Sequence, residues 1–286
     1  MTRRIVSLAL AAFAFCACAQ QAAYDLTEHL GCCYGIDGAS TITEAGGSYV
    51  EIGINGFLIP EESDEAFAAN LAAAKACQLP ILAGNGYYPG DIKLTGPEAD
   101  LDRAVNYART AITRAEQVGL KYMVLGSGGA RRIPDGFDRD EARAQFVELL
   151  RQMGPIAAEH GITIVIEPLR PEETNFINSV REGTSICKEV NHPSVCVLAD
   201  FYHMAQAGED AGAIVEAGSL LRHCHIAECE RRSAPGVEGD DFTPYFKALK
   251  EIGYEGNVSI ECVWDDFNAQ LAPAFAEMKK QIQSIQ

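Results

Sequence analysis

Four acidic or histidine side chains stand at the carboxyl ends of short apolar segments in the second half of the chain. They are Glu167, Asp200, His225 and Glu261. Successive members lie roughly 25–36 residues apart, which is about the length of one strand followed by one helix. Three carboxylates and one imidazole form a ligand set for a hard or borderline divalent cation. The pattern therefore predicts a metal site assembled from the ends of four strands.

Segments rich in β-forming residues alternate with helical patterns along the whole chain. The expected strands cover residues 30–36, 49–55, 79–84, 122–125, 163–167, 195–200, 221–226 and 258–263. The expected helices include residues 63–78, 97–118, 139–160, 242–252 and 267–285. This regular alternation predicts an α/β fold, a (β/α)8 TIM barrel that forms a single domain over residues 20–286. A doubly wound open sheet is the alternative, which is less favoured because no G-x-G-x-x-G follows the first strand.

The direction of the strand side chains is consistent with such a barrel. Successive residues of a strand point to opposite faces, so Glu167, His225 and Glu261 can all point inwards only if their neighbours point outwards. The outward neighbours are apolar and suited to packing against helices. They include Ile166, Cys224 and Ile260. The four polar residues are thus expected to converge at the C-terminal mouth of the barrel, where active sites of this fold lie.

The first 19 residues have the pattern of a signal segment. Arg3 and Arg4 precede an apolar stretch, residues 5–15, that is too short to span a bilayer. The small residues that follow allow two kinds of processing. Ala17 and Ala19 fit the A-x-A pattern of a soluble exported protein, whereas residues 15–18 form a loose lipobox that would lipidate Cys18. We favour the lipoprotein, and in either case we expect export from a bacterial cell, to the periplasm or to a lipid anchor.

Composition narrows the classes of partner. The formal net charge of −17 disfavours nucleic acid as a partner, because nucleic acid binds to basic surfaces. We expect contact with a membrane only through a lipid anchor. The ten cysteines are scattered without any C-x-x-C, which argues against a cysteine-ligated zinc site and predicts buried thiols. The sequence leaves the assembly open, with a homo-oligomer as one option.

The second half of the chain also resembles a known family. The segments that carry the resemblance begin at Glu167-Pro-Leu, Asp200-Phe-Tyr-His203, His223-Cys-His225 and Ile260-Glu261. They are similar to the xylose isomerase-like sugar isomerases and epimerases, a family that also contains apurinic-site endonucleases. The resemblance extends in layout over nearly all of the chain that follows the signal segment.

The resemblance implies roles for individual residues. Glu167, Asp200, His225 and Glu261 match the ligands of a divalent metal ion such as Mn, Mg, Co or Zn. Glu167 and Glu261 also match the carboxylate pair that exchanges protons with the substrate carbon in the ketose 3-epimerase branch. The positions that match substrate-binding residues are His203, Arg231 and Glu173. The chain departs from the family at Arg170-Pro171, where Asn-Arg is usual.

We therefore expect a metal-dependent sugar isomerase or epimerase that abstracts a proton next to a carbonyl and forms an enediolate. Two carboxylates on opposite faces of the substrate would invert a carbon centre, whereas transfer on one face would interconvert aldose and ketose. A keto-sugar lyase or dehydratase with the same first step is an alternative, and so is a non-catalytic sugar-binding lipoprotein. The endonuclease branch is disfavoured, because it needs several further histidines and this acidic chain has six in all.

Overall fold

The computed structural model describes residues 24–285. The predicted signal segment and the processing at Cys18 lie outside these residues and stay predictions. None of the helices in the described part combines the length and the hydrophobicity that crossing a bilayer requires.

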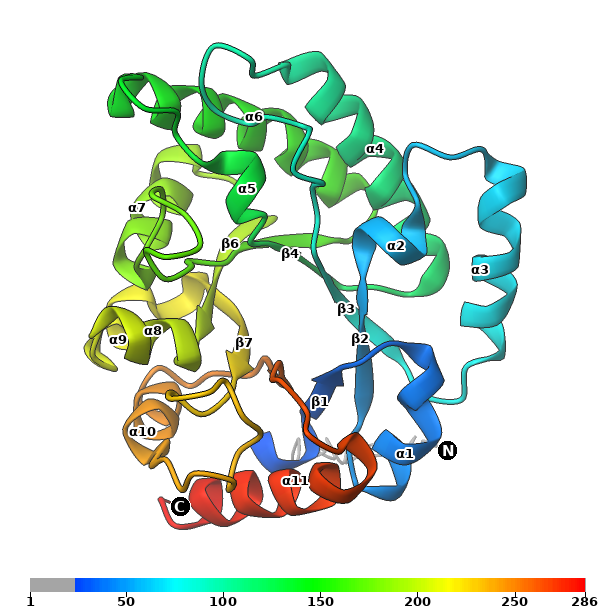
Figure 1. Ribbon diagram of the computed structural model, residues 1–286, viewed down its shortest axis with the longest axis vertical. Coiled ribbons are helices and arrows are strands. Elements are labelled where there is room, and N and C mark those ends of the chain that lie inside the picture. Colours follow the sequence, from blue (N-terminus) through cyan, green and yellow to red (C-terminus); the bar gives the residue numbers. More distant parts are fainter. Residues whose placement is uncertain (1–23, 286) are drawn as a thin grey trace, which may run out of the picture.

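Eight parallel strands close into a barrel in chain order, and β1 completes the ring by pairing with β8. The strands are β1 Leu30–Cys33, β2 Tyr49–Gly53, β3 Ile81–Asn85, β4 Tyr122–Leu125, β5 Thr163–Ile166, β6 Val195–Asp200, β7 Leu221–Ile226 and β8 Asn257–Ile260. Figure 1 shows the helices arranged around the outside of this ring. The TIM barrel expected from the sequence is confirmed.

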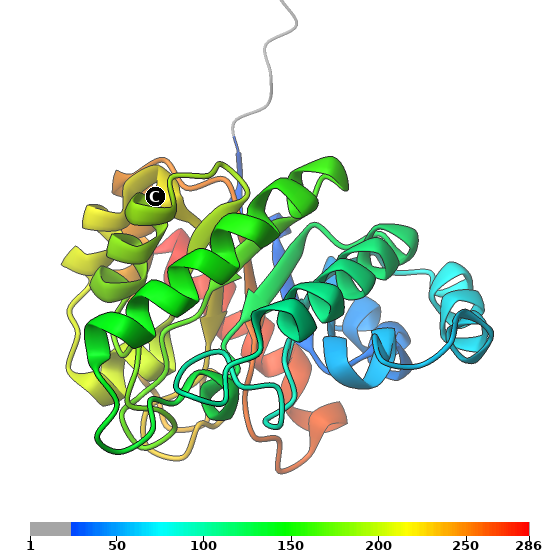
Figure 2. The same cartoon turned by 90° about the horizontal axis from the view of Figure 1, so that it is seen from above.

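The helices differ widely in length, and the long ones follow strands β3, β4 and β8. They are α1 Ala39–Glu44, α2 Ile54–Leu58, α3 Asp64–Ala76, α4 Leu101–Val118, α5 Gly128–Arg131, α6 Arg139–Glu159, α7 Val180–Val190, α8 Phe201–Ala207, α9 Gly212–Ala217, α10 Thr243–Glu251 and α11 Phe267–Gln283. Helices α4 and α6 lie next to each other along one side of the barrel (Figure 2). Side-chain caps at Asp100 and Asp138 accept hydrogen bonds from main-chain N–H groups and fix where these two helices begin.

The strand ends decide where the candidate ligands stand. Strands β4, β6 and β7 have the predicted bounds, but β5 and β8 end one and three residues earlier than expected, at Ile166 and Ile260. Glu167 and Glu261 therefore follow their strands directly, whereas Asp200 and His225 belong to theirs. Strand β1 also ends early, before Gly35, whose φ of 93° is incompatible with an extended strand.

The protein packs two apolar layers, one between the strands and the helices and one inside the barrel. The inner layer contains Val124, Val165 and Leu198, and it closes the barrel beneath the mouth. All eight cysteines in the described part of the chain are free thiols; four are buried as predicted and the other four are partly exposed.

Candidate metal centre

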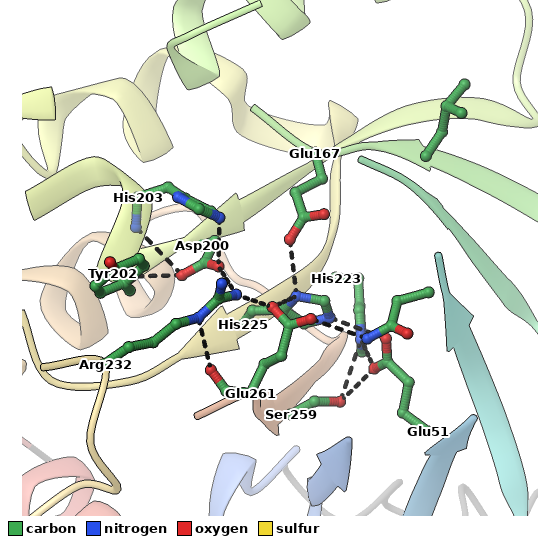
Figure 3. Close-up of polar contacts among 12 residues, drawn as sticks. Glu51, Glu167, Asp200, Tyr202, His203, His223, His225, Arg232, Ser259 and Glu261 are labelled. Carbon is green, nitrogen blue, oxygen red and sulfur yellow. Dashed lines mark hydrogen bonds and ion pairs between the residues drawn. The ribbon is translucent and has the colours of Figure 1, made fainter. Parts of the chain in front are cut away.

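Glu167, Asp200, His225 and Glu261, which we call the mouth cluster, meet at the carboxyl ends of β5 to β8 (Figure 3). Each offers one ligand atom, and these four atoms lie within 4.8 Å of one another. The Nδ1 atom of His225 lies 3.0 Å from Glu167 Oε1 and 3.2 Å from Glu261 Oε2. The structure thus brings together all four residues that the sequence pattern singled out.

One carboxylate oxygen of Asp200 makes no hydrogen bond. Its Oδ1 accepts hydrogen bonds from the main-chain N–H groups of Tyr202 and His203 and caps α8. Its Oδ2 is buried and has no hydrogen-bond partner, and the same is true of Nε2 of His203, 3.5 Å away. Buried polar atoms without partners are costly, and an acceptor among two more carboxylates and an imidazole suits a divalent cation. The residues present therefore fit the metal that the sequence predicted.

The two glutamates of the mouth cluster have different electrostatic surroundings. Burial raises the pKa of Glu167, and the negative charge of Glu261 raises it further. Burial acts in the same direction on Glu261, but the positive charges of His225 and Arg232 outweigh it and lower the pKa of Glu261 to about 2. In the metal-free chain Glu167 is therefore the carboxyl that takes up a proton more readily.

A residue that the sequence reasoning missed fixes the orientation of His225. Glu51 of β2 is buried, and its Oε1 lies 3.0 Å from Nε2 of His225. Its other oxygen lies 3.0 Å from Nε2 of His223 and accepts a hydrogen bond of 2.7 Å from Ser259. Burial opposes the charged form of His225, but Glu51 and Glu261 raise its pKa well above the usual value. A carboxylate in this position holds the ring so that Nδ1 faces the mouth cluster, an arrangement common around metal-binding histidines. The available signal was a lone carboxylate within the otherwise apolar segment 49–53.

Two of the three predicted substrate-binding residues border the cluster. His203 is buried beside Asp200, and its Nδ1 accepts a hydrogen bond of 3.3 Å from the main-chain N–H of Arg170. Glu173 is about one-third exposed and forms an ion pair of 2.9 Å with the side chain of Arg170. The structure therefore places His203 against the cluster and Glu173 on the loop above it.

The third residue, Arg231, is not at the mouth. Its side chain is 59% exposed and pairs with Glu238 at 2.6 Å. The next residue, Arg232, reaches the cluster instead, with Nη2 at 2.5 Å from Glu261 Oε2 and 3.6 Å from Asp200 Oδ2. Arg232 has a left-handed backbone with φ of 55°, which turns the chain so that the two side chains diverge. Arg232, not Arg231, is therefore the arginine that contacts the cluster, and a substrate-binding role for Arg231 stays a prediction.

Asn85 and Tyr202 complete the border of the cluster. The side-chain amide of Asn85, at the end of β3, donates a hydrogen bond of 2.9 Å to Oε1 of Glu261. The ring of Tyr202 lies 4.9 Å from the guanidinium of Arg232 and 5.3 Å from that of Arg170, so it separates two cations at the mouth. These contacts leave the cluster with a polar border suited to a hydroxylated molecule.

Comparisons with known proteins agree with this geometry. Residues 40–285 match the model of the xylose isomerase-like TIM barrel family. An L-ribulose 3-epimerase from Methylomonas sp. (strain DH-1) is 30% identical over 222 residues, which are 76% of this chain and 74% of the relative. A D-psicose 3-epimerase from Ruminiclostridium cellulolyticum is 38% identical over 117 residues, but the match spans only 39% of its length.

A solved structure has the same fold. The structure of D-psicose 3-epimerase from Clostridium cellulolyticum H10 with D-tagatose superposes with a TM-score of 0.77 and 22% sequence identity. The superposition covers 90% of this chain and 99% of that one.

Proposed function

The chain belongs to the xylose isomerase-like TIM barrel family and is an enzyme of the sugar isomerase and epimerase class; we propose that it inverts a carbon atom next to the carbonyl of a keto-sugar. The relatives are named as epimerases of keto-sugars, and this supports the same class of small-molecule substrate here. The observation that carries the proposal is the convergence of two glutamates with an aspartate and a histidine within 4.8 Å.

The mouth cluster supplies what the first chemical step needs. A divalent cation held by Glu167, Asp200, His225 and Glu261 would act as a Lewis acid towards the charge that develops on the substrate oxygens. Asp200 contributes its unpartnered Oδ2, and Glu51 keeps Nδ1 of His225 directed at the same point. Asp200 and His225 would thus serve to position the substrate carbonyl through the cation, while Glu167 and Glu261 transfer the proton.

Inversion requires one carboxylate that removes a proton and another that returns one to the opposite face. At any moment, one of the two must be ionised while the other carries a proton. Glu167 and Glu261 follow different strands, β5 and β8, and both carboxylates reach the cluster, at 3.0 Å and 3.2 Å from Nδ1 of His225, so each is available for one of these transfers. The two roles exchange when the reaction runs in reverse, because each carboxylate ends the cycle in the state in which the other began.

The border residues fit binding of sugar hydroxyl groups. His203 has an unpartnered Nε2 beside Asp200, and Arg232 lies against Asp200 and Glu261. Both are placed to hydrogen-bond oxygens of a substrate held at the mouth cluster. We propose these two as substrate-binding residues, with Glu173 acting through the side chain of Arg170.

The test is incubation of the metal-loaded protein with a panel of keto-sugars in D2O, followed by NMR. We expect an epimer that carries deuterium at the inverted carbon next to the carbonyl. Exchange between two adjacent carbons would instead indicate a one-base isomerase, and loss of a substituent would indicate a lyase. Sugar binding without exchange or turnover would favour the non-catalytic binding protein and overturn the proposal.

A further inference from the structure

A second group of metal-ligating side chains shares His225 with the mouth cluster and includes Glu51, whose Oε1 lies 3.0 Å from Nε2 of His225. It consists of Cys33 at the end of β1, Glu51 in β2 and His225 in β7, and we call it the inner cluster. One ligand atom from each lies within 4.8 Å of the other two. Cys33 and Glu51 are register partners in the β1–β2 pair, so the barrel itself sets them side by side. The proposed function gives roles to His225 and Glu51 but none to Cys33.

The donors of the inner cluster differ in kind from those of the mouth. A thiol, an imidazole and a carboxylate match the soft and borderline donors that zinc and cadmium prefer. A further imidazole is at hand, since Nε2 of His223 lies 3.0 Å from the second oxygen of Glu51. Glu51, His223 and His225 are buried, and Cys33 is partly buried. The mouth cluster, by contrast, has three carboxylates and no sulfur.

We propose that the inner cluster is a second cation site, which takes a thiophilic divalent ion such as zinc through Sγ of Cys33, the carboxylate of Glu51 and Nε2 of His225. Binding displaces the thiol proton of Cys33, which leaves to solvent, and no bond between protein atoms forms or breaks. The sequence showed no pattern of a cysteine-ligated site, because this one has a single cysteine and its ligands are spread over three strands.

The two sites share the imidazole of His225, so an ion bound at one site should weaken ion binding at the other. Glu51 of the inner cluster faces Nε2 of His225, whereas Glu167 of the mouth cluster faces Nδ1. A neutral imidazole has one nitrogen with a free lone pair, while the other carries the proton. An ion on Nε2 therefore leaves an N–H on Nδ1, directed at Glu167, and the mouth loses one of its four ligands. This antagonism rests on the proposed function of the mouth cluster, whereas ion binding at the inner cluster does not.

The first experiment tests the inner cluster alone. The metal-free protein is titrated with cadmium while the ultraviolet absorption band of a cadmium–thiolate bond is recorded. We expect one saturable thiolate per chain in the wild type and in Cys77→Ser, a variant at the end of α3, and loss of this band in Cys33→Ser. Glu51→Gln should weaken cadmium binding by about tenfold or more, with the band retained at saturation. An undiminished band in Cys33→Ser, or no saturable band in the wild type, would overturn the site.

The second experiment tests the antagonism. Free manganese is measured by electron paramagnetic resonance as it is added to the protein with and without one equivalent of zinc. We expect zinc to weaken manganese binding by about tenfold or more in the wild type and to have little effect in Cys33→Ser. Equal weakening in both proteins would mean that zinc competes at the mouth itself, and no weakening would mean that the sites are independent; either result overturns the antagonism. Failure of manganese to bind without zinc would count against the proposed function, while the cadmium band would still report on the inner cluster.

Discussion

Two sides of the mouth each supply one glutamate: Glu167 follows β5, on the side we call the β5 wall, and Glu261 follows β8, on the β8 wall. The two carboxylates differ in the groups that surround them. On the β8 side, Glu261 is surrounded by polar side chains. Arg232 pairs with it at 2.5 Å and Asn85 donates a hydrogen bond at 2.9 Å, while the positive charges of His225 and Arg232 lower the pKa of Glu261 to about 2. The hold on Glu261 thus depends on side chains from the end of β3 and from the loop after β7.

On the β5 side, the carboxylate of Glu167 lies 3.0 Å from Nδ1 of His225, and the residue is held besides through its main chain and by the shape of its surroundings. The buried guanidinium of Arg131 donates hydrogen bonds to the main-chain oxygens of Glu167, at 2.8 Å, and of Leu125, at 3.0 Å. Gly126 passes so close to the carboxylate that a methyl group at this position would overlap it. Both glutamates contact His225, but a close steric contact adds to the hold on Glu167 and a charged partner adds to the hold on Glu261, so the two walls should respond to different substitutions.

The largest expected effect comes from removing either base. In Glu167→Gln or Glu261→Gln the amide oxygen can still bind a metal, but it cannot accept a proton, so we expect kcat to fall by about 10²–10⁴-fold. Proton–deuterium exchange into the substrate measures this loss, and excess metal should not reverse it. Asp200→Asn is the matched control, because it weakens a ligand but leaves both bases, so excess metal should restore part of the activity. Full rescue of Glu261→Gln by metal would make Glu261 a ligand only and favour a one-base isomerase.

The steric hold on Glu167 predicts a strong effect of a single methyl group. Gly126→Ala should push the Glu167 carboxylate out of place and lower kcat by about tenfold to a hundredfold, because small displacements of a reacting group are costly. Gly129→Ala is the control, since a methyl group there meets nothing within 4 Å. Steady-state kinetics on both variants measures the difference. Equal activity of the two would show that the β5 wall tolerates displacement.

Because Arg232 and not Arg231 pairs with Glu261, substitution of these two adjacent arginines should affect kcat/KM differently. Arg232→Gln removes the ion pair to Glu261, so we expect kcat/KM to fall by about tenfold and its acid limb to move to higher pH. Arg231→Gln removes only an exposed pair with Glu238, which typically contributes about 0–1 kcal/mol, and should leave kcat/KM within about twofold. A larger loss in Arg231→Gln would restore the assignment based on family resemblance.

The smallest expected effect is on the stability of the metal-free protein. The raised pKa of Glu167 means that its ionised form is disfavoured in the folded state, so stability falls as the pH rises through that pKa. Glu167→Gln should therefore raise Tm near neutral pH by a few degrees, about 2–4 °C for each kcal/mol, and the gain should vanish in acid.

Glu261→Gln should do the opposite. The pKa of Glu261 is lowered to about 2 from an ordinary 4.5, so its ionised form stabilises the fold above pH 4.5 and this contribution is lost as the pH falls towards 2. Thermal unfolding of both variants in the presence of a chelator, over a range of pH, separates the two signs. A common response would mean that the two walls do not differ electrostatically.

Local sequence was sufficient for three strands, two of which carry Asp200 and His225 of the mouth cluster. Segments 122–125, 195–200 and 221–226 were predicted with the observed bounds, because runs of apolar β-forming residues are bracketed there by helix-forming or turn residues. The alternation within a strand also fixes the inward direction of His225, since a side chain and its neighbour cannot share a face. The repeated strand–helix unit then determines that successive strand ends meet at one mouth.

Contacts between distant strands were decided by the closure of the barrel. Glu51 is 174 residues from His225 in the chain and becomes its partner only when the ring closes. Cys33 joins them for the same reason, and nothing near either residue in the sequence marks the contact. Arg232 rather than Arg231 contacts the mouth cluster because of one left-handed backbone angle, and a resemblance in spacing does not specify such an angle. The sequence by itself determined the barrel, its mouth and the four candidate ligands, because these follow from periodicity and chain order. The tertiary structure decided their partners, because burial and charge between strands depend on where the chain meets itself.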